Sequence, residues 1–491
     1  MISARLKDFL QPILCIKLKY LPLLTIYFAD AFAVFSQIAH VFWIKDSLSL
    51  TSNEIISISI LANLPWSMKI IFGQLLDTFK IGGSQRKSYT FIAAFLMLLG
   101  NIITIAIANQ YDAITNLSST YKLLIFSGFI ITLGVILQDL VADTLCNEVV
   151  NKNQSKEQIK QEIGKIQILV RIIQISAGIV AVGISGVITS KFGYATISYF
   201  IPIVTLISIL GSLIVRKEPV VRLEKLNMNI LSYGIMYFSI IILFIFIDFD
   251  YSQESIFIAG IIIVSTALYK ICDHLSAQKK KEVFCILIVI FSCRAVPVYG
   301  PGIGWWQIDV LGFTPEYYSI LAQIGIVLSF IGLWFFAKRI INRDVGMVML
   351  ILNSIHVILQ LPMIAIAYGF DKWTMHHFGF GAKAITIMDN IAEGPFFKLS
   401  FLMLCTVATY YAPKKNIATW FALVMSLMSL AYVSGGRILT KFLSNLYPIE
   451  RGSYENVGDL MIVTTLINFL MPTIIILIFL NPFSKKIIKN I

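Results

Sequence analysis

The chain has 491 residues, of which 57% are hydrophobic and 13% are charged. Soluble domains carry about 25% charged residues, so this composition excludes an ordinary soluble protein. The net charge of +12 would suit a nucleic-acid partner, but the positions of the basic residues, given below, exclude that class.

Apolar stretches of about 20 residues, long enough to cross a bilayer, recur along the whole chain. The basic stretch 1–19 precedes an apolar segment too long for a signal-peptide core, so we expect it to stay attached. The sequence predicts an all-α polytopic membrane protein of fourteen spans, at residues 20–44, 53–76, 89–109, 121–149, 164–189, 194–215, 228–248, 255–271, 283–310, 317–338, 344–368, 384–411, 417–442 and 460–480.

The basic residues are distributed unequally between the two sides of this layout. With a cytoplasmic N-terminus, 27 of the 39 Lys and Arg residues fall on the cytoplasmic side, 6 on the opposite side and 6 within spans. Such a bias follows the positive-inside rule. It predicts an even number of spans with both termini cytoplasmic, in a plasma (inner) membrane. The basic excess therefore reflects membrane topology and lipid contact rather than nucleic-acid binding.

The chain divides into two halves separated by an extra helix pair. Residues 185–192 (Ser-Gly-Val-Ile-Thr-Ser-Lys-Phe) resemble residues 435–442 (Gly-Gly-Arg-Ile-Leu-Thr-Lys-Phe), which indicates a repeat. Repeated halves are typical of secondary carriers. We predict a cytoplasmic segment at 1–19, a six-helix bundle at 20–215, a connector with the extra pair at 216–282, a second six-helix bundle at 283–480 and a cytoplasmic tail at 481–491.

A short basic turn joins the second and third spans. The second span ends in Gly73 and Asp77, and the turn contains Arg86 and Lys87. Glycine lets two helices approach closely, and an aspartate can pair with the basic turn or with the N-terminus of a neighbouring helix. These four residues are predicted to form a conformational latch on the cytoplasmic side.

A first group of charged residues lies inside the spans of the first half. An ionised side chain at mid-membrane costs at least about 2.5 kcal/mol, so each one needs a partner or water. Asp139 and Asp143 stand at i and i+4, on one helix face, and Lys69, Asp143 and Arg171 share a layer about 10 Å deep. The group forms either a structural salt-bridge cluster or a relay for protons or substrate.

The ninth span interrupts its own helical pattern. After Arg294, the sequence Ala-Val-Pro-Val-Tyr-Gly-Pro-Gly-Ile-Gly (295–304) contains two prolines and three glycines. Proline removes a backbone hydrogen bond that lipid cannot replace. The segment is predicted to be either a cavity-lining hinge or a packing kink.

A second group of charged residues lies near the membrane midplane. It either contacts substrate or protons, or contains a structural Arg294–Glu393 ion pair. Gln37 and His40 lie beyond it on the first span, and for His40 a packing role is favoured over a role as proton carrier. The group comprises Asp30, Arg294, Glu393 and Lys398.

Motifs for cofactors and catalysis are not found in the sequence. A G-x-x-x-x-G-K-[ST] phosphate loop, H-E-x-x-H and G-x-S-x-G do not occur, and the six cysteines form no C-x-x-C pair. We therefore expect no cofactor, no metal and no enzymatic activity.

Four stretches resemble the folate-biopterin transporter family of the major facilitator superfamily. The first runs from Leu64-Pro-Trp-Ser-Met-Lys69 through the Gly73–Asp77 pair to Arg86-Lys87-x-Tyr89. The others are Gln138-Asp-Leu-Val-Ala-Asp143-Thr, Leu311-Gly-Phe-Thr-Pro-Glu316 and Ala418-Thr-Trp-Phe-Ala-Leu-Val-Met-Ser426.

The resemblance implies a carrier of two six-helix bundles that takes up folates or pterins by alternating access, coupled to protons. It puts Lys69, Asp77, Arg86, Asp139 and Asp143 at motif positions. The extra helix pair and the sequence around Arg294 depart from the family pattern.

The side-chain chemistry is compatible with such a substrate. An anionic folate tail would suit Arg294 or Lys398, and the pterin edge would suit Asp30 or Glu393. Trp305 and Trp306 could stack on a pterin ring.

Two alternatives remain open from the sequence. A fourteen-helix layout with a Gln-Asp-x-x-x-Asp motif also resembles muropeptide and acetyl-CoA permeases of the same superfamily. A polytopic membrane enzyme is the third possibility, which the short, basic loops disfavour.

Overall fold

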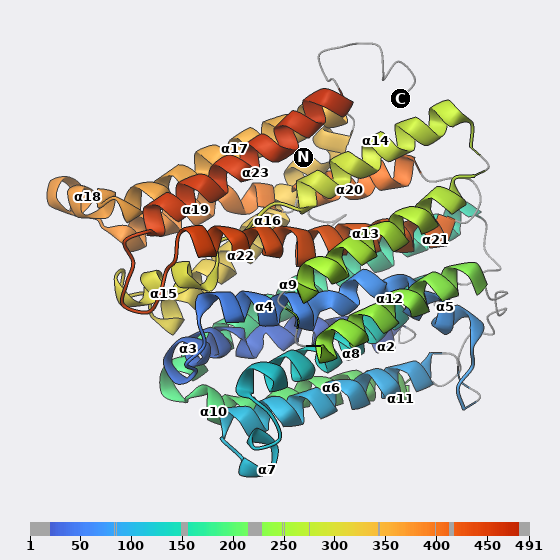
Figure 1. Cartoon of the computed structure of the whole chain (residues 1–491), viewed down its shortest axis with the longest axis horizontal. Coiled ribbons are helices and arrows are strands. Elements are labelled where there is room, and N and C mark those ends of the chain that lie inside the picture. The colour runs from blue at the N-terminus through green and yellow to red at the C-terminus, as the bar shows by residue number, and fades with distance from the viewer. Residues whose placement is uncertain are drawn as a thin grey trace. The chain divides into compact units, whose positions relative to one another are not determined.

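The computed structural model describes residues 20–480 except positions 83, 85, 149–155, 215–227, 248, 250, 274, 342–343, 398 and 412–416. Helices make up nearly all of this part of the chain, and it contains no β-strand (Figure 1). The contacts divide the chain into two compact units. The first consists of Met1–Ile44 with Phe72–Asn227, and the second of Lys45–Ile71 with Met228–Ile491.

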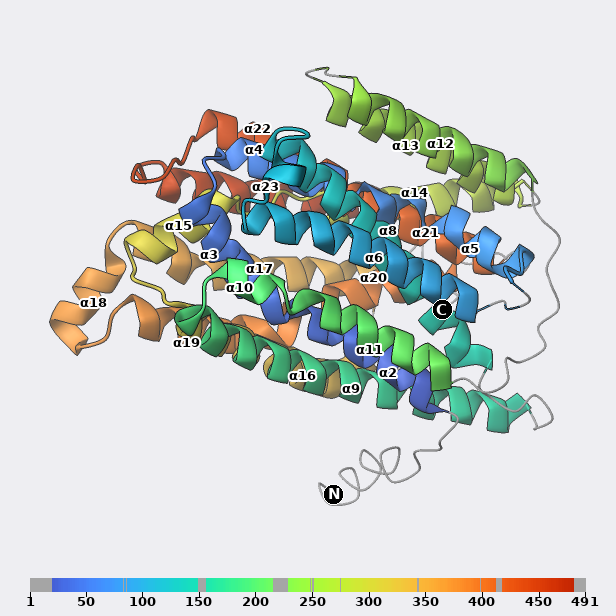
Figure 2. The same cartoon turned by 90° about the horizontal axis from the view of Figure 1, so that it is seen from below.

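The first unit is built from long apolar helices that pack closely along one another. α6 runs beside α8 (Figures 1 and 2), and α2 packs against α9 and α11. Its core contains Leu23, Ala93 and Val141, all fully buried. The helices are α2 (Leu21–Phe32), η2 (Ala33–Ser36), α3 (Gln37–Ser47), α5 (Lys69–Thr78), α6 (Lys87–Ala108), α7 (Asp112–Thr115), α8 (Thr120–Glu148), α9 (Lys156–Lys191), α10 (Tyr194–Ser198) and α11 (Ile201–Ile214), and the unit boundaries fall within α3 and α5.

The second unit contains the remaining helices, including the predicted extra pair. Those two helices, α12 and α13, pack side by side (Figure 2), and α13 also packs on α21. α16 packs with α19, and α17 with α23. The helices are α4 (Ser52–Asn63), η3 (Leu64–Met68), α12 (Met228–Phe246), α13 (Ser252–Ile271), α14 (Ala277–Arg294), α15 (Pro301–Asp309), α16 (Pro315–Ile341), α17 (Val345–Ala367), α18 (Phe370–Phe378), α19 (Ala382–Phe397), α20 (Leu399–Tyr410), α21 (Ile417–Leu430), the π-helix η4 (Ala431–Gly436), α22 (Arg437–Leu446) and α23 (Val457–Phe479).

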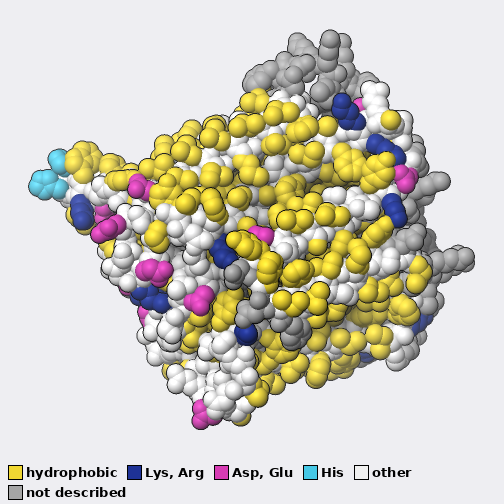
Figure 3. All heavy atoms as spheres, in the orientation of Figure 1, with side chains coloured by type: hydrophobic (Ala, Val, Ile, Leu, Met, Phe, Trp, Pro, Cys, Tyr) yellow, Lys and Arg dark blue, Asp and Glu magenta, His cyan; other side chains and the backbone are white. Residues whose placement is uncertain are grey.

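Each of the fourteen predicted spans contains a helix, and eleven described helices are long and apolar enough to cross a membrane. Large hydrophobic side chains on α23 are exposed at every fourth position, at Leu466, Leu470, Ile474 and Ile478. Residues four apart lie on one face of a helix, and an exposed apolar face of this kind is typical of a membrane-spanning helix. Hydrophobic side chains likewise cover most of the visible surface over α14, α17 and α23 (Figure 3). The chain is an integral multi-pass membrane protein.

One grouping differs from the predicted division of the chain. Residues Lys45–Ile71 belong to the unit that holds the C-terminal helices, whereas the sequence places all of them in the first six-helix bundle. The predicted boundaries at residues 216 and 283 stay a prediction.

Glycine allows the close approach of α6 and α8. A Cβ atom built at Gly134 would lie 2.6 Å from the Ala93 carbonyl oxygen and 2.6 Å from the Met97 side chain. We expect Gly134→Ala to reduce stability by about 1–3 kcal/mol, because the backbone of α6 would have to move. Thermal unfolding of the purified protein in detergent measures this loss.

Gly193→Ala is the matched control, since no atom lies within 4 Å of a Cβ at Gly193. A melting temperature lowered equally by both substitutions would contradict the packing explanation.

Candidate functional site

The ninth predicted span is broken, as the sequence indicates. α14 ends at Arg294, residues 295–300 are not helical, and α15 begins at Pro301. The Val298 N–H donates a hydrogen bond to Thr440 Oγ1, over 2.9 Å. A Cβ at Gly436 would lie 2.4 Å from the Val296 carbonyl oxygen. The break therefore packs against η4 and α22, which supply a hydrogen-bond partner that lipid lacks.

Arg294 lies at the start of the break, among aromatic rings. Its guanidinium carbon is 4.5 Å from the ring centre of Tyr432 and 5.5 Å from that of Phe401. Its Nε atom is buried without a hydrogen-bond partner among the described residues. Within the same part of the chain, no ion pair joins Arg294 to Glu393, so the structural pair considered from the sequence is not present.

A hydrogen-bond network connects the break to a carboxylate on α19. Glu393 accepts a hydrogen bond from Gln360 Nε2 of α17 over 3.4 Å, and its Oε1 atom is 3.5 Å from His356 Nδ1. Tyr299, which lies in the break, donates to Gln360 Oε1 over 3.0 Å, and its hydroxyl is 3.0 Å from Thr465 Oγ1 on α23. The network thus contains side chains from three helices, and Gln360 connects Glu393 to the non-helical segment.

A second carboxylate, Asp389, lies one turn before Glu393 on α19. Its Oδ1 atom is buried and has no hydrogen-bond partner within the described part of the chain. Two carboxylates at i and i+4 repel each other when both are charged, and a partly buried site screens that repulsion less than water does.

His356, Gln360 and Tyr299 were not among the site residues predicted from the sequence. A signal was available, because His356 and Gln360 stand four residues apart within an apolar span, as do Asp389 and Glu393. Two polar pairs with this spacing indicate polar faces on two membrane helices.

The first group of predicted charges is distributed over both units. Tyr27 donates a hydrogen bond to Asp143 Oδ1 over 2.7 Å. Asp139 is half-buried on α8. Arg171 is exposed and binds Gln174 on its own helix at 2.9 Å, so its expected pairing with a carboxylate is not found among the described residues. Lys69 belongs to the second unit and lies 4.7 Å from the Trp66 ring centre.

The basic turn of the predicted latch caps α5. Arg86 is buried, and its Nη1 donates to the Leu76 carbonyl oxygen over 3.0 Å, while the Tyr89 hydroxyl donates to Leu75 O over 2.8 Å. A cation near the last carbonyls of a helix is favourable. Lys87 begins α6 and is half-buried.

The structure describes less of the other two latch residues, Gly73 and Asp77. No described atom lies within 4 Å of a Cβ built at Gly73, so the described residues contain no close helix approach there, and its part in a latch stays a prediction. Asp77 lies in α5, but its side chain is outside the described residues.

The predicted aromatic contacts lie inside the second unit. Trp305 is 1% exposed, and the Arg451 guanidinium lies 4.4 Å from its ring centre. Trp306 is buried in a cluster with Ile303 and Phe313. In this structure both indoles pack against protein, and their contact with a substrate stays a prediction.

The remaining predicted site residues lie in the first unit or outside the described part. Asp30 is half-buried on α2, and Gln37 is exposed on α3. The His40 ring lies 5.6 Å from Trp43 and 5.3 Å from Tyr194, which favours the packing role. Lys398 is outside the described residues.

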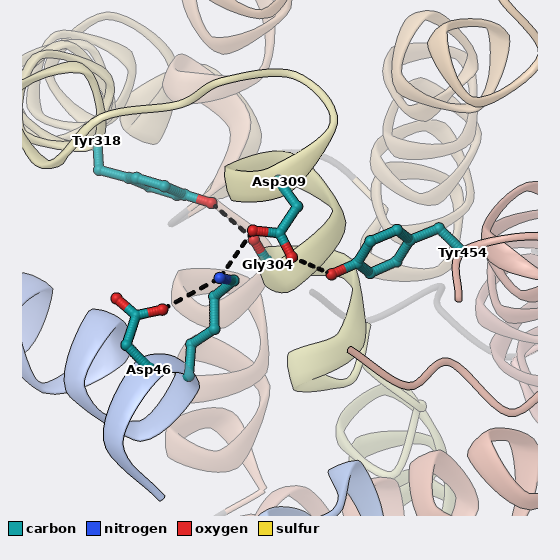
Figure 4. Close-up of polar contacts among 6 residues, drawn as sticks. Asp46, Gly304, Asp309, Tyr318 and Tyr454 are labelled. Carbon is teal, nitrogen blue, oxygen red and sulfur yellow. Dashed lines mark hydrogen bonds and ion pairs between the residues drawn. The ribbon is translucent and has the colours of Figure 1, made fainter. Parts of the chain in front are cut away.

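An ion pair that the sequence analysis did not predict joins α3 and α15 within the second unit (Figure 4). Lys45 Nζ is 2.7 Å from Asp309 Oδ1 and 3.1 Å from Asp46 Oδ1, and Tyr454 donates a hydrogen bond to Asp309. Partial burial raises the pKa of Asp309, but the hydrogen bonds from Lys45 and Tyr454 and the Lys45 charge outweigh it. The pKa of Asp309 is therefore below its ordinary value.

Comparison with known proteins gives consistent matches. The profile of the BT1 family matches residues 32–491. The folate-biopterin transporter of a Synechocystis strain is 21% identical over 455 residues, covering 91% of this chain and 78% of the relative. The probable folate-biopterin transporter 4 of Arabidopsis thaliana is 29% identical over 125 residues, covering 26% of this chain and 24% of the relative.

Solved structures share the architecture. An auto-inhibited POT family peptide transporter aligns with a TM-score of 0.63 at 11% identity, over 95% of this chain and 97% of that one. This likeness concerns the fold, and it confirms the predicted all-α fold of the major facilitator type. The relatives and the fold are those of transporters of small molecules rather than enzymes. The chain belongs to the BT1 family of membrane transporters.

Proposed function

We propose that this transporter moves a folate, a pterin or a similar small metabolite across the membrane together with protons, by alternating access. The observation that carries the proposal is the network from Glu393 through Gln360 to Tyr299, because it joins an ionisable group to the helix break. The names of the two relatives, which are folate-biopterin transporters, support the substrate class.

The chemistry of this network supports proton coupling. A deprotonated Glu393 accepts the Gln360 hydrogen bond and attracts a protonated His356. A proton on either Glu393 or Asp389 removes their mutual repulsion, and a proton on Glu393 also weakens its hold on Gln360. Gln360 is then free to move with Tyr299, and the break moves with Tyr299. Substrate binding beside the break and proton binding on α19 would thereby favour the same conformation.

Alternating access is supported by the contacts of Lys45–Ile71 within the second unit. Lys45 pairs with Asp309, Asn53 donates a hydrogen bond to Asn445, and a Cβ at Gly300 would lie 3.7 Å from Ser52 Oγ. The charge distribution supports a position of Lys45 on the side opposite the cytoplasm. We infer that these contacts close the outer end and separate when it opens. The same distribution supports a plasma (inner) membrane location with both termini cytoplasmic.

Uptake by purified protein in lipid vesicles tests the proposal. We expect labelled folic acid to accumulate under an inward proton gradient, and labelled muropeptide to remain outside. Glu393→Gln should reduce the gradient-driven accumulation at least about tenfold, an effect of about 1.4 kcal/mol, since the amide cannot bind and release a proton.

Glu455→Gln, which changes an exposed acid outside the network, is the matched control and should transport as the wild type does. Accumulation of muropeptide instead of folic acid would replace the proposed substrate. Full gradient-driven uptake by Glu393→Gln would refute the coupling role.

The ion pair in Figure 4 predicts a pH dependence of stability. The pKa of Asp309 is lowered in the folded protein. The ionised side chain therefore stabilises the fold above its ordinary pKa of about 4, and this stabilisation is lost as the pH falls through the lowered pKa. We expect at most about 1 kcal/mol, since the pair is partly exposed. Lowering the pH from above this range to below it should therefore reduce the melting temperature of Asp309→Asn less than that of the wild type.

Asp371→Asn on α18 serves as the control, because its carboxylate forms no ion pair with any described residue. An Asp309→Asn curve parallel to that of the wild type would show that the ion pair makes no contribution.

A further inference from the structure

We propose that Arg294 and Arg437, with Tyr432 between them, form a binding subsite for a carboxylate of the transported molecule. This inference rests on the proposed function and deepens it, because it makes the preferred substrate an anion rather than a neutral pterin. The subsite lies entirely within the second unit.

The two guanidinium groups share one aromatic ring. The guanidinium carbon of Arg294 lies 4.5 Å from the ring centre of Tyr432, and that of Arg437 lies 5.8 Å from the same centre. Both distances fall within the range of cation–π contacts, about 6 Å. Tyr432 is 37% exposed, so the ring can also meet a ligand.

The π-helix explains why residues so far apart in sequence meet here. η4 ends in Gly435 and Gly436, directly before Arg437. A Cβ at Gly435 would lie 3.4 Å from the Ala295 side chain, and one at Gly436 would lie 2.4 Å from Val296 O. The backbone just after Arg294 therefore rests on the backbone just before Arg437. Single-turn π-helices occur frequently at functional sites.

No described carboxylate neutralises the charge of this pair. In the described part of the chain neither arginine has a carboxylate partner, and the Nε atom of each is buried without a hydrogen-bond partner. Arg437 lies nine residues before the end of α22 at Leu446, or about 14 Å along the helix, which is too deep for a lipid headgroup. Two like charges in this position require water and a counter-anion.

A carboxylate is the anion that fits these groups best. Guanidinium is planar and donates two parallel hydrogen bonds to one carboxylate, and the Tyr432 ring offers a surface for an adjoining aromatic group. A carboxylate-bearing tail attached to an aromatic ring meets both requirements, whereas biopterin has no carboxylate.

Binding of three probes to purified full-length protein tests the subsite. Folic acid contains both a pterin and an anionic tail, p-aminobenzoylglutamate contains the tail alone, and biopterin contains the pterin alone. We expect Arg437→Gln to weaken binding of folic acid and p-aminobenzoylglutamate at least tenfold, and to change the biopterin Kd less than twofold. Arg294→Gln should give the same pattern, and Arg437→Lys should retain part of the affinity.

Lys372→Gln is the control, because it removes one positive charge from an exposed residue of α18 in the same unit, outside the subsite. Its folic acid Kd should equal that of the wild type. Equal weakening of all three probes by Arg437→Gln, or no weakening of p-aminobenzoylglutamate, would overturn the subsite. Arginine-dependent binding of p-aminobenzoylglutamate without any binding of folic acid or biopterin would retain the subsite and refute the folate or pterin substrate instead.

Discussion

The arrangement of this transporter depends on one constraint, that a backbone in a lipid bilayer must find its hydrogen-bond partners within the protein. The chain departs from helical structure between α14 and α15, at residues 295–300. There the hydroxyl of Thr440 accepts the Val298 N–H, and the glycines of the π-helix let α22 approach the break. The break is thus held by other helices, which makes its position sensitive to what those helices bind.

Acidic and basic side chains of the second unit both lie around this break, and their surroundings differ. The carboxylate of Glu393 belongs to a hydrogen-bond network that includes Gln360 and Tyr299. The guanidinium of Arg294 lies among aromatic rings without a carboxylate partner among the described residues. A networked acid suits the binding and release of a proton, whereas an unneutralised cation suits an anionic solute. We therefore propose that this short non-helical segment connects a coupling site to a substrate site.

Long-range contacts decide features that short motifs leave open. Glycine at position 73 permits close helix packing but does not require it, and no described atom lies near its would-be Cβ. Arg171 shares a predicted membrane layer with Asp143, yet it binds Gln174 on its own helix. Depth along a helix can be counted from the sequence, whereas the direction in which a side chain points around the bundle depends on how the helices pack.

The sequence by itself determined the membrane class, the position of all fourteen helical segments, the break after Arg294 and the family resemblance. These follow from local properties: apolar length, proline and glycine chemistry, and short motifs. Only the tertiary structure decided that Arg437 and Tyr432 lie beside Arg294, that Gln360 joins Glu393 to Tyr299, and that Lys45 pairs with Asp309. These contacts join residues between 33 and 264 positions apart, and no local pattern specifies which helix faces meet.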